Sequence, residues 1–285
     1  MVKIVTDDAS SIPEPAVRKY DITILKHPLY FGDEEATGIL PDQFYKRVKE
    51  GEMPRTMLLP TGDLINTYLA CRQTGKKLDT DAILSIHLSS KMSGTYNSAL
   101  TAAEMVKDKV KVEVLDTGLT TLGEGMIVLE TAVESFNGKD IMSAKTKAEE
   151  VKSKVKMILA IPDLNFLHRG GRLGKGKALL GAIMRIIPMV TFDDGEIIPF
   201  GRARTEHQII SKIKDEIRKD LAKYKSNKLK VLLGYTTDEK ICRELEESIR
   251  KEFPVDELHI LQLNSVVGVY LGLGAWGISY YPVGG

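Results

Sequence analysis

The chain of 285 residues contains few of the features that point directly to a chemistry. Its two cysteines, Cys71 and Cys242, lie in helix-like patterns, so we expect free thiols in a reducing compartment. Its five histidines are scattered without the spacing of metal ligands, which argues against a metal centre. The net charge is only +1, so the charge balance gives no sign of a nucleic-acid partner.

Nucleotide-binding and membrane-spanning patterns are missing as well. The glycine- and lysine-rich run 170–177 resembles a phosphate-binding loop, but no serine or threonine follows its lysine in the required position. The most apolar stretch, 178–190, is interrupted by Arg185 and Pro188 and is too short to cross a membrane. The chain opens with a strand-like segment in place of a secretory signal. We therefore expect a cytoplasmic protein.

Strand-like and helix-like segments alternate along the chain. Strands are predicted at 2–6, 82–86 and 110–115, with a helix at 95–106 between the last two. Such alternation predicts an α/β fold with largely parallel sheets and helices on both faces. In the second half, an Asp-Gly turn predicts a β-hairpin at 189–200.

A domain boundary is expected near residue 155. The N-terminal α/β domain, 1–155, contains a serine-rich loop. The C-terminal α/β domain, 156–285, contains the hairpin and a β-α-β unit at 229–263. Thr236 and Glu239 fit a capping box at the start of the helix in that unit. A short apolar helix is predicted at 177–184.

The serine-rich loop, 87–99, is the most informative stretch of the chain. It connects a buried strand to a helix, which is where α/β sheets bind ligands and where free backbone N–H groups favour an anion. Ser93 lies at the turn, and Gly94 lets a ligand approach the backbone closely. The loop predicts a carboxylate or phosphate site near Ser93. The alternative is that its serines only cap the helix.

Other polar and glycine-rich segments admit two interpretations each. Ser93 as a hydrolase nucleophile lacks the Gly-x-Ser-x-Gly turn, and the histidine nearest in sequence is His87. Arg202 and Arg204 follow the hairpin and either hold a carboxylate or phosphate or form surface ion pairs. Three glycines within 269–278 indicate either close ligand approach or a tight turn into a terminal strand.

Five motifs follow one another along the chain. They are the opening Val5-Thr6-Asp7-Asp8-Ala9-Ser10-Ser11-Ile12-Pro13, the serine loop from Leu88 to Ala99, Asp116-Thr117-x-x-x-Thr121-x-Gly123-x-Gly125, Leu164-x-x-Leu167-x-Arg169-Gly170-Gly171-Arg172-Leu173, and Arg204-Thr205. In this order they resemble the motifs of the DegV family of bacterial fatty-acid-binding proteins, and the resemblance runs from end to end.

The resemblance implies two α/β domains with one long-chain fatty acid, such as palmitate, buried between them. The carboxylate would be held by hydroxyls, with Ser93 and Gly94 at the head group, and no cofactor would be needed. It also implies that a separate fatty acid kinase converts the bound acid to an acyl phosphate. Arg204 would then support the polar end or the contact with that kinase. The apolar region 178–190, with Met184 and Met189, either lines the acyl tunnel or is plain core.

Two positions depart from the family pattern. The family's Thr-Ser-Gln-Pro-Ser/Thr appears here as Thr56-Met57-Leu58-Leu59-Pro60-Thr61, so Thr61 supplies the second hydroxyl only if the proline is displaced by one place. Tyr270 replaces a histidine that precedes the terminal glycine turn. Its hydroxyl can donate to a carboxylate but carries no positive charge.

The sequence is therefore interpreted as a fatty-acid-binding protein without catalytic activity of its own. Thr61, Ser93, Gly94, Arg204 and Tyr270 are the expected lipid-binding residues. The alternatives are a Ser93-dependent hydrolase or acyl transferase, and a binder of another lipid carboxylate without a kinase partner.

Overall fold

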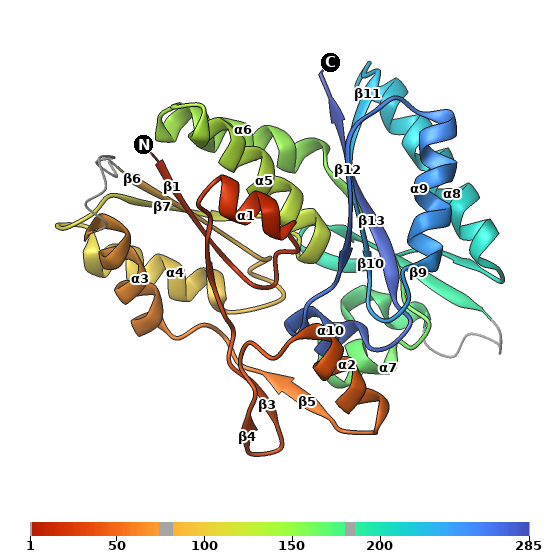
Figure 1. Ribbon diagram of the computed structural model, residues 1–285, viewed down its shortest axis with the longest axis horizontal. Coiled ribbons are helices and arrows are strands. Elements are labelled where there is room, and N and C mark those ends of the chain that lie inside the picture. The colour runs from red at the N-terminus through yellow and green to blue at the C-terminus, as the bar shows by residue number, and fades with distance from the viewer. Residues whose placement is uncertain (1, 74–81, 180–185, 285) are drawn as a thin grey trace. The chain divides into compact units, whose positions relative to one another are not determined.

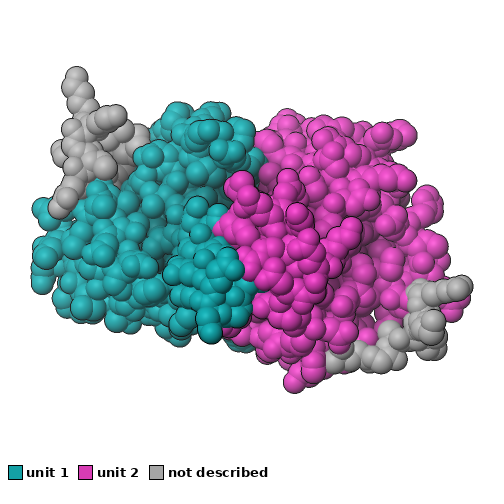
Figure 2. All heavy atoms as spheres, turned by 60° about the horizontal axis from the view of Figure 1, so that its bottom comes forward, with its two compact units in different colours: residues 1–38, 56–153 teal, residues 39–55, 154–285 magenta. Residues whose placement is uncertain are grey.

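The computed structural model describes residues 2–73, 82–179 and 186–284. The chain divides into two compact units (Figure 2). Unit 1 comprises residues 1–38 and 56–153, and unit 2 comprises residues 39–55 and 154–285. The division between residues 153 and 154 lies close to the boundary expected near residue 155. The assignment of residues 39–55 to unit 2 was not expected from the sequence.

Unit 1 is built on a parallel sheet with the strand order β2-β1-β6-β7. Figure 1 shows α3 and α4 on one face of this sheet and α5 and α6 on the other. The strands are β1 (Val2–Asp7), β2 (Thr23–Leu25), β6 (Ala82–His87) and β7 (Val112–Asp116), and the helices are α1 (Glu14–Lys19), α3 (Thr61–Gln73), α4 (Thr95–Val106), α5 (Thr121–Phe136) and α6 (Ile141–Lys154). A small sheet has the order β4-β3-β5, formed by β3 (Leu29–Phe31), β4 (Glu34–Glu35) and β5 (Pro54–Thr56).

The core of unit 1 explains why these segments form these elements. β6 is buried along its whole length, as expected for a central strand of a parallel sheet covered on both faces. Val5 and Ile83 pack in one apolar cluster with the buried residues of α3 and α4, among them Leu64, Tyr68 and Ala99. This packing holds β1 and β6 against α3 and α4.

Unit 2 contains a six-stranded sheet with the order β10-β9-β8-β13-β11-β12. Its strands are β8 (Lys156–Ala160), β9 (Ile187–Asp193), β10 (Glu196–Ala203), β11 (Lys228–Tyr235), β12 (Val255–Gln262) and β13 (Trp276–Val283). Its helices are α2 (Pro41–Lys49), α7 (Asn165–Arg169), the 3-10 helix η1 (Gly174–Leu179), α8 (Glu206–Lys223), α9 (Lys240–Glu252) and α10 (Ser265–Leu271).

The direction of the strands in unit 2 differs from the sequence prediction. β11 and β12 are parallel, as the predicted β-α-β unit requires, but the neighbouring pairs from β10 to β11 are antiparallel. The last strand, β13, inserts between β8 and β11 and runs against both. The expectation of largely parallel sheets therefore applies to unit 1, and the sheet of unit 2 is mixed.

Two local predictions in unit 2 need correction. The capping box is wrong, because Glu239 is the N-cap of α9 without a side-chain cap, and Thr236 Oγ1 instead accepts from Ala275 N at 3.0 Å. Of the helix predicted at 177–184, residues 177–179 belong to the 3-10 helix η1, and the remainder, Met184 included, lies outside the described residues. Met189 is fully buried in the main core of unit 2, which favours the interpretation of that residue as plain core.

Gly125 is the tightest glycine of α5 and provides a test of the packing in unit 1. A Cβ added there would lie 2.1 Å from the carbonyl oxygen of Ser11. We expect Gly125→Ala to lower the free energy of unfolding by about 1–3 kcal/mol in urea denaturation. Gly62→Ala is the matched control, because nothing lies within 4 Å of a Cβ at that helical glycine. Equal stability of the two variants would contradict the described packing.

Candidate functional site

The candidate site lies at the carboxyl ends of β1 and β6 in unit 1. These strands are parallel neighbours, with Thr6 opposite Ile86, so the segments that follow them leave the same edge of the sheet. Asp7 is the last residue of β1 and is followed by Asp8, and His87 is the last residue of β6 and leads into the serine loop. The polar groups of two motifs far apart in the sequence are thereby brought together.

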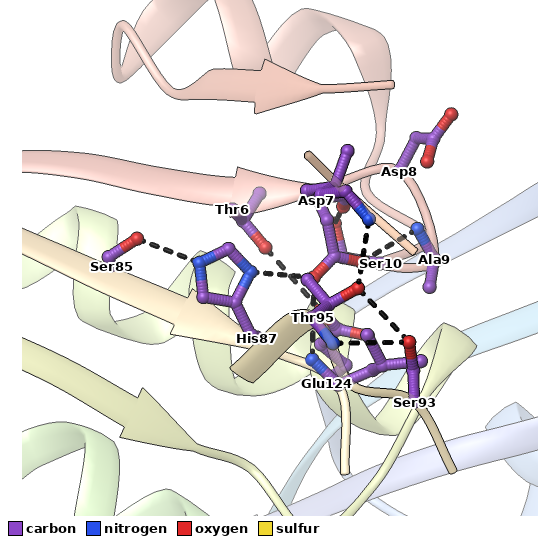
Figure 3. A network of polar contacts seen from close by, with 12 residues as sticks. Thr6, Asp7, Asp8, Ala9, Ser10, Ser85, His87, Ser93, Thr95 and Glu124 are labelled. Atoms are coloured by element: carbon purple, nitrogen blue, oxygen red, sulfur yellow. Dashed lines mark hydrogen bonds and ion pairs between the residues drawn. The ribbon is translucent and has the colours of Figure 1, made fainter. Parts of the chain in front are cut away.

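Asp7 and His87 form a fully buried pair at this edge. Asp7 Oδ2 and His87 Nδ1 are 2.7 Å apart, and both side chains have no exposed surface. His87 Nε2 lies 2.8 Å from Ser85 Oγ, which accepts a hydrogen bond from the hydroxyl of Tyr68. Figure 3 shows His87 between Ser85 and Asp7. Burial acts to raise the pKa of Asp7, but the bond to His87 and the charges of His27 and His87 outweigh it and lower the pKa.

Glu124, on α5, is a second buried acidic group near Asp7. Its side chain is fully buried, and its Oε1 accepts from Thr6 Oγ1 at 3.5 Å. Burial raises the pKa of Glu124 well above its ordinary value, and the negative charges of Asp7 and Asp8 raise it further. The environment therefore favours the protonated form of Glu124.

A second polar chain leads from Asp8 to Ser93. Asp8 Oδ1 lies 2.7 Å from His27 Nδ1, and His27 Nε2 lies 3.0 Å from Thr95 Oγ1. Thr95 Oγ1 is 3.0 Å from Ser93 Oγ, and Figure 3 shows these two residues side by side. His27 and Thr95 are buried, whereas Ser93 is half-buried. The chain thus connects the partly buried Asp8–His27 pair to a hydroxyl that reaches the surface of unit 1.

Ser93 and Gly94 immediately precede α4, as predicted. Gly94 is the N-cap residue, and no side chain provides a cap bond for this helix. Ser93 Oγ accepts instead from Thr95 N at 3.3 Å, within the turn. Leu58 lies against Gly94, and Leu59 N approaches Thr95 Oγ1 at 3.5 Å. Leu58 and Leu59, which precede Thr61 in the sequence, therefore contact the turn at Ser93 and Gly94.

The other expected residues lie in different places. Thr61 is half-buried and begins α3 in unit 1. Tyr270, on α10 of unit 2, packs over Gly170, and Arg172 lies 5.4 Å from the centre of its ring. Arg204 is exposed immediately before α8 of unit 2. Within unit 2, Tyr270 therefore contacts the turn Arg169-Gly170-Gly171-Arg172.

Sequence reasoning missed His27, Asp8 and Thr95 as members of the site. Asp8 and Thr95 stand within motifs that were recognised, but His27 lies in an extended run without a local signal. His87, the histidine considered as a base for Ser93, has both ring nitrogens engaged by Asp7 and Ser85.

The chemistry of the second chain does not favour a hydrolase. Its order of carboxylate, imidazole and hydroxyl is that of a catalytic triad, but the hydroxyl next to His27 is that of Thr95, which is fully buried. Burial lowers the pKa of His27, yet the bond to Asp8 and the charges of Asp7 and Asp8 outweigh it and raise the pKa. A protonated imidazole has no lone pair with which to act as a base.

The described residues contain neither a candidate metal site nor a candidate membrane span. Within residues 2–73, 82–179 and 186–284, no group of three or more histidine, cysteine, aspartate and glutamate side chains has the arrangement of a metal site. Among the same residues, no helix combines the length and apolar character needed to span a bilayer.

The fold and this edge of the sheet define an α/β protein with a hydroxyl site backed by two hydrogen-bonded aspartate–histidine pairs. The chain belongs to the DegV family, since the model of that family, described as "Uncharacterised protein, DegV family", matches residues 1–283. Protein DegV of Bacillus subtilis is 31% identical over 287 residues, with 98% of each chain covered. A DegV domain-containing protein of Halalkalibacterium halodurans is 30% identical, again with 98% of each covered.

Solved structures agree with this assignment. A DegV family protein from Thermus thermophilus, described by its fatty acid binding, superposes with a TM-score of 0.90 at 26% identity and 99% coverage of both chains. The crystal structure of DegV from Bacillus subtilis, described as a fatty acid binding protein, gives a TM-score of 0.86 at 30% identity and 98% coverage of both. These two family members are described by fatty acid binding, and the predicted resemblance to the family is confirmed.

Asp7 allows the electrostatics of the buried pair to be tested. We expect Asp7→Asn to lower the free energy of unfolding at pH 7 by about 3–5 kcal/mol, because one charge of a buried pair is removed. Because the pKa of Asp7 is lowered by folding, its contribution is present above the ordinary carboxyl pKa and is lost as the pH falls through the lowered value.

The difference in the free energy of unfolding between the parent and Asp7→Asn, measured by urea denaturation, should therefore shrink as the pH falls. Asp33→Asn, at an exposed aspartate, is the control and should leave stability within about 0.5 kcal/mol. A gap that is small at pH 7, or that grows in acid, would contradict this account of the pair.

Proposed function

We propose that the protein binds one long-chain fatty acid and that Ser93 donates a hydrogen bond to its carboxylate. The observation that carries this proposal is the position of the Ser93 hydroxyl, half-buried at the turn before α4 and backed by the His27 chain. An anion is favoured there by the backbone N–H groups and the dipole at the start of α4. The Thermus and Bacillus relatives, described as binding fatty acids, support this choice of anion.

The acyl tail supplies most of the affinity in this proposal. Each buried methylene contributes about 0.8 kcal/mol, so the tail holds the ligand and the head-group contacts orient it. A binder of this kind needs no cofactor. It would work in the cytoplasm, in keeping with the two free cysteines, Cys71 and Cys242.

The roles that we propose for Thr61, Tyr270 and Arg204 rest on the family resemblance. Thr61 and Tyr270 would each contribute a hydroxyl to the head group, with Tyr270 replacing the family's histidine. A separate fatty acid kinase would phosphorylate the bound acid, and the exposed Arg204 would support the contact with that kinase. Arginine suits such a role because its planar group donates two parallel hydrogen bonds.

Mass spectrometry of an organic extract of the purified protein tests the proposed function. We expect one C14–C18 fatty acid per chain, and a higher melting temperature when such an acid is added to delipidated protein, because a ligand of the folded state stabilises it. A protein that yields no lipid and gains no stability from any of these acids would contradict the proposal.

Ser93→Ala tests the head-group contact. A hydrogen bond to a charged group contributes about 1.5–3 kcal/mol, so the Kd for palmitate should rise by roughly ten- to a hundredfold while the tail preserves some binding. Ser98→Ala, at a half-buried serine of α4, is the matched control and should bind as the parent does. If both variants bind palmitate equally well, Ser93 does not contact the carboxylate.

Arg204→Ala separates retention of lipid from transfer to the kinase. We expect the variant to keep its bound acid but to be phosphorylated on that acid at least about tenfold more slowly by a cognate kinase, the loss typical of one charged contact. Arg243→Ala removes an exposed arginine of α9 and serves as the control. Equal losses of lipid and of phosphorylation in Arg204→Ala would show that Arg204 acts on the lipid site.

A further inference from the structure

The donors and acceptors in the hydrogen-bond chain from Asp8 to Ser93 can be assigned by counting the protons and lone pairs of each group. Asp8 Oδ1 accepts from the backbone N–H of His27 at 3.0 Å and lies 2.7 Å from His27 Nδ1. A carboxylate only accepts, so Nδ1 carries a proton. The imidazole is thereby fixed, with its other nitrogen, Nε2, 3.0 Å from Thr95 Oγ1.

Thr95 is the point at which the chain turns toward the surface. A hydroxyl has one proton to donate and two lone pairs that accept. Leu59 N–H approaches Thr95 Oγ1 at 3.5 Å, and His27 Nε2 approaches it at 3.0 Å. When Nε2 is protonated, both neighbours donate, and the proton of Thr95 is directed to Ser93 Oγ, 3.0 Å away.

The same count at Ser93 leaves a proton for the ligand. Its Oγ accepts from the hydroxyl of Thr95 and from the backbone N–H of Thr95, which is 3.3 Å away. Both lone pairs face Thr95, and neither contact requires the proton of Ser93. That proton is available to an acceptor outside the chain, and an ionised carboxylate is the strongest such acceptor in the proposed function.

We propose that Asp8, His27 and Thr95 are positioning residues that make Ser93 an outward hydrogen-bond donor, so that the site selects an ionised carboxylate and releases it when His27 is deprotonated. This inference rests on the proposed function, because it assumes that the carboxylate of a fatty acid binds at Ser93. A neutral His27 would keep its proton on Nδ1 and accept at Nε2. The proton of Thr95 would then turn back to His27, and Ser93 would lose the donor that aligns it.

The groups around His27 favour its charged form. Asp8 contacts it directly, and Asp7, at the end of β1, contributes a second negative charge. Asp7 is itself shared with His87 of β6, and the carboxyl group of Glu124 on α5 faces the same aspartates. Burial acts to lower the pKa of His27, but the two aspartates raise it above the ordinary value. This shift favours the imidazolium form of His27.

The sign of the pH dependence follows. A free carboxylic acid has a pKa of about 4, so the ligand stays ionised above about pH 6. Affinity for palmitate should then be constant while His27 is charged and should fall as the pH rises through the raised pKa of His27. Methyl palmitate has the same tail without the charge and should show little of this dependence.

The test compares palmitate affinity of five proteins from about pH 6 to pH 9. We expect Thr95→Val to raise the Kd about fivefold to tenfold at pH 7 and to flatten the pH profile, because the hydroxyl that passes the proton is lost. Thr95→Ser keeps that hydroxyl and should restore both affinity and profile. His27→Gln, which has no titrating group, should flatten the profile as well. Thr101→Val, at an exposed threonine of α4, is the control and should match the parent.

The outcomes separate the two claims. If the parent binds no palmitate at any pH, the proposed function is wrong and this inference is overturned with it. If the parent binds palmitate but Thr95→Val and Thr95→Ser behave alike, or Thr95→Val keeps the parental pH profile, the positioning role is wrong and the proposed function stands. An NMR titration that places the pKa of His27 below about 6.5 would also overturn the inference.

Discussion

The site depends on two adjacent aspartates at the end of β1, each of which holds a different histidine. Asp7 pairs with His87, and Asp8 pairs with His27. Burying an unpaired charge is costly, so each of these groups requires its partner to remain in the interior. One pair joins β1 to β6 beneath the serine loop, and the other extends to Thr95 and Ser93. The half-buried hydroxyl of Ser93 is positioned by these two aspartate–histidine pairs.

The sequence predicted the parts of unit 1 that local patterns determine. The short apolar strand, the helix from Thr95 and the turn with Ser93 and Gly94 appear where they were expected, because strand burial and glycine placement leave direct signals. The mixed sheet of unit 2 was not predicted, since a strand pattern does not encode the direction in which β13 inserts. His27 was missed for a related reason: its role arises from contacts with residues distant in the sequence.

The structure shows the surroundings of the residues that depart from the family pattern. Met57 and Leu58 replace polar residues of the family pattern, and both are about half-exposed, with Leu58 against Gly94. The polar side chains behind Ser93 are instead those of Thr95, which contacts Ser93, and His27, which contacts Thr95; all three belong to unit 1. In unit 2, Tyr270 carries no charge, and the guanidinium of Arg172 lies over its ring.

The central claim is that Ser93 holds a fatty-acid carboxylate. A crystal structure of the protein with bound palmitate tests it most directly. The account predicts a carboxylate oxygen within about 2.5–3.0 Å of Ser93 Oγ, the range of a hydroxyl–carboxylate hydrogen bond, with Thr95 still between Ser93 and His27. A carboxylate bound elsewhere, with Ser93 contacting only protein atoms, would contradict it.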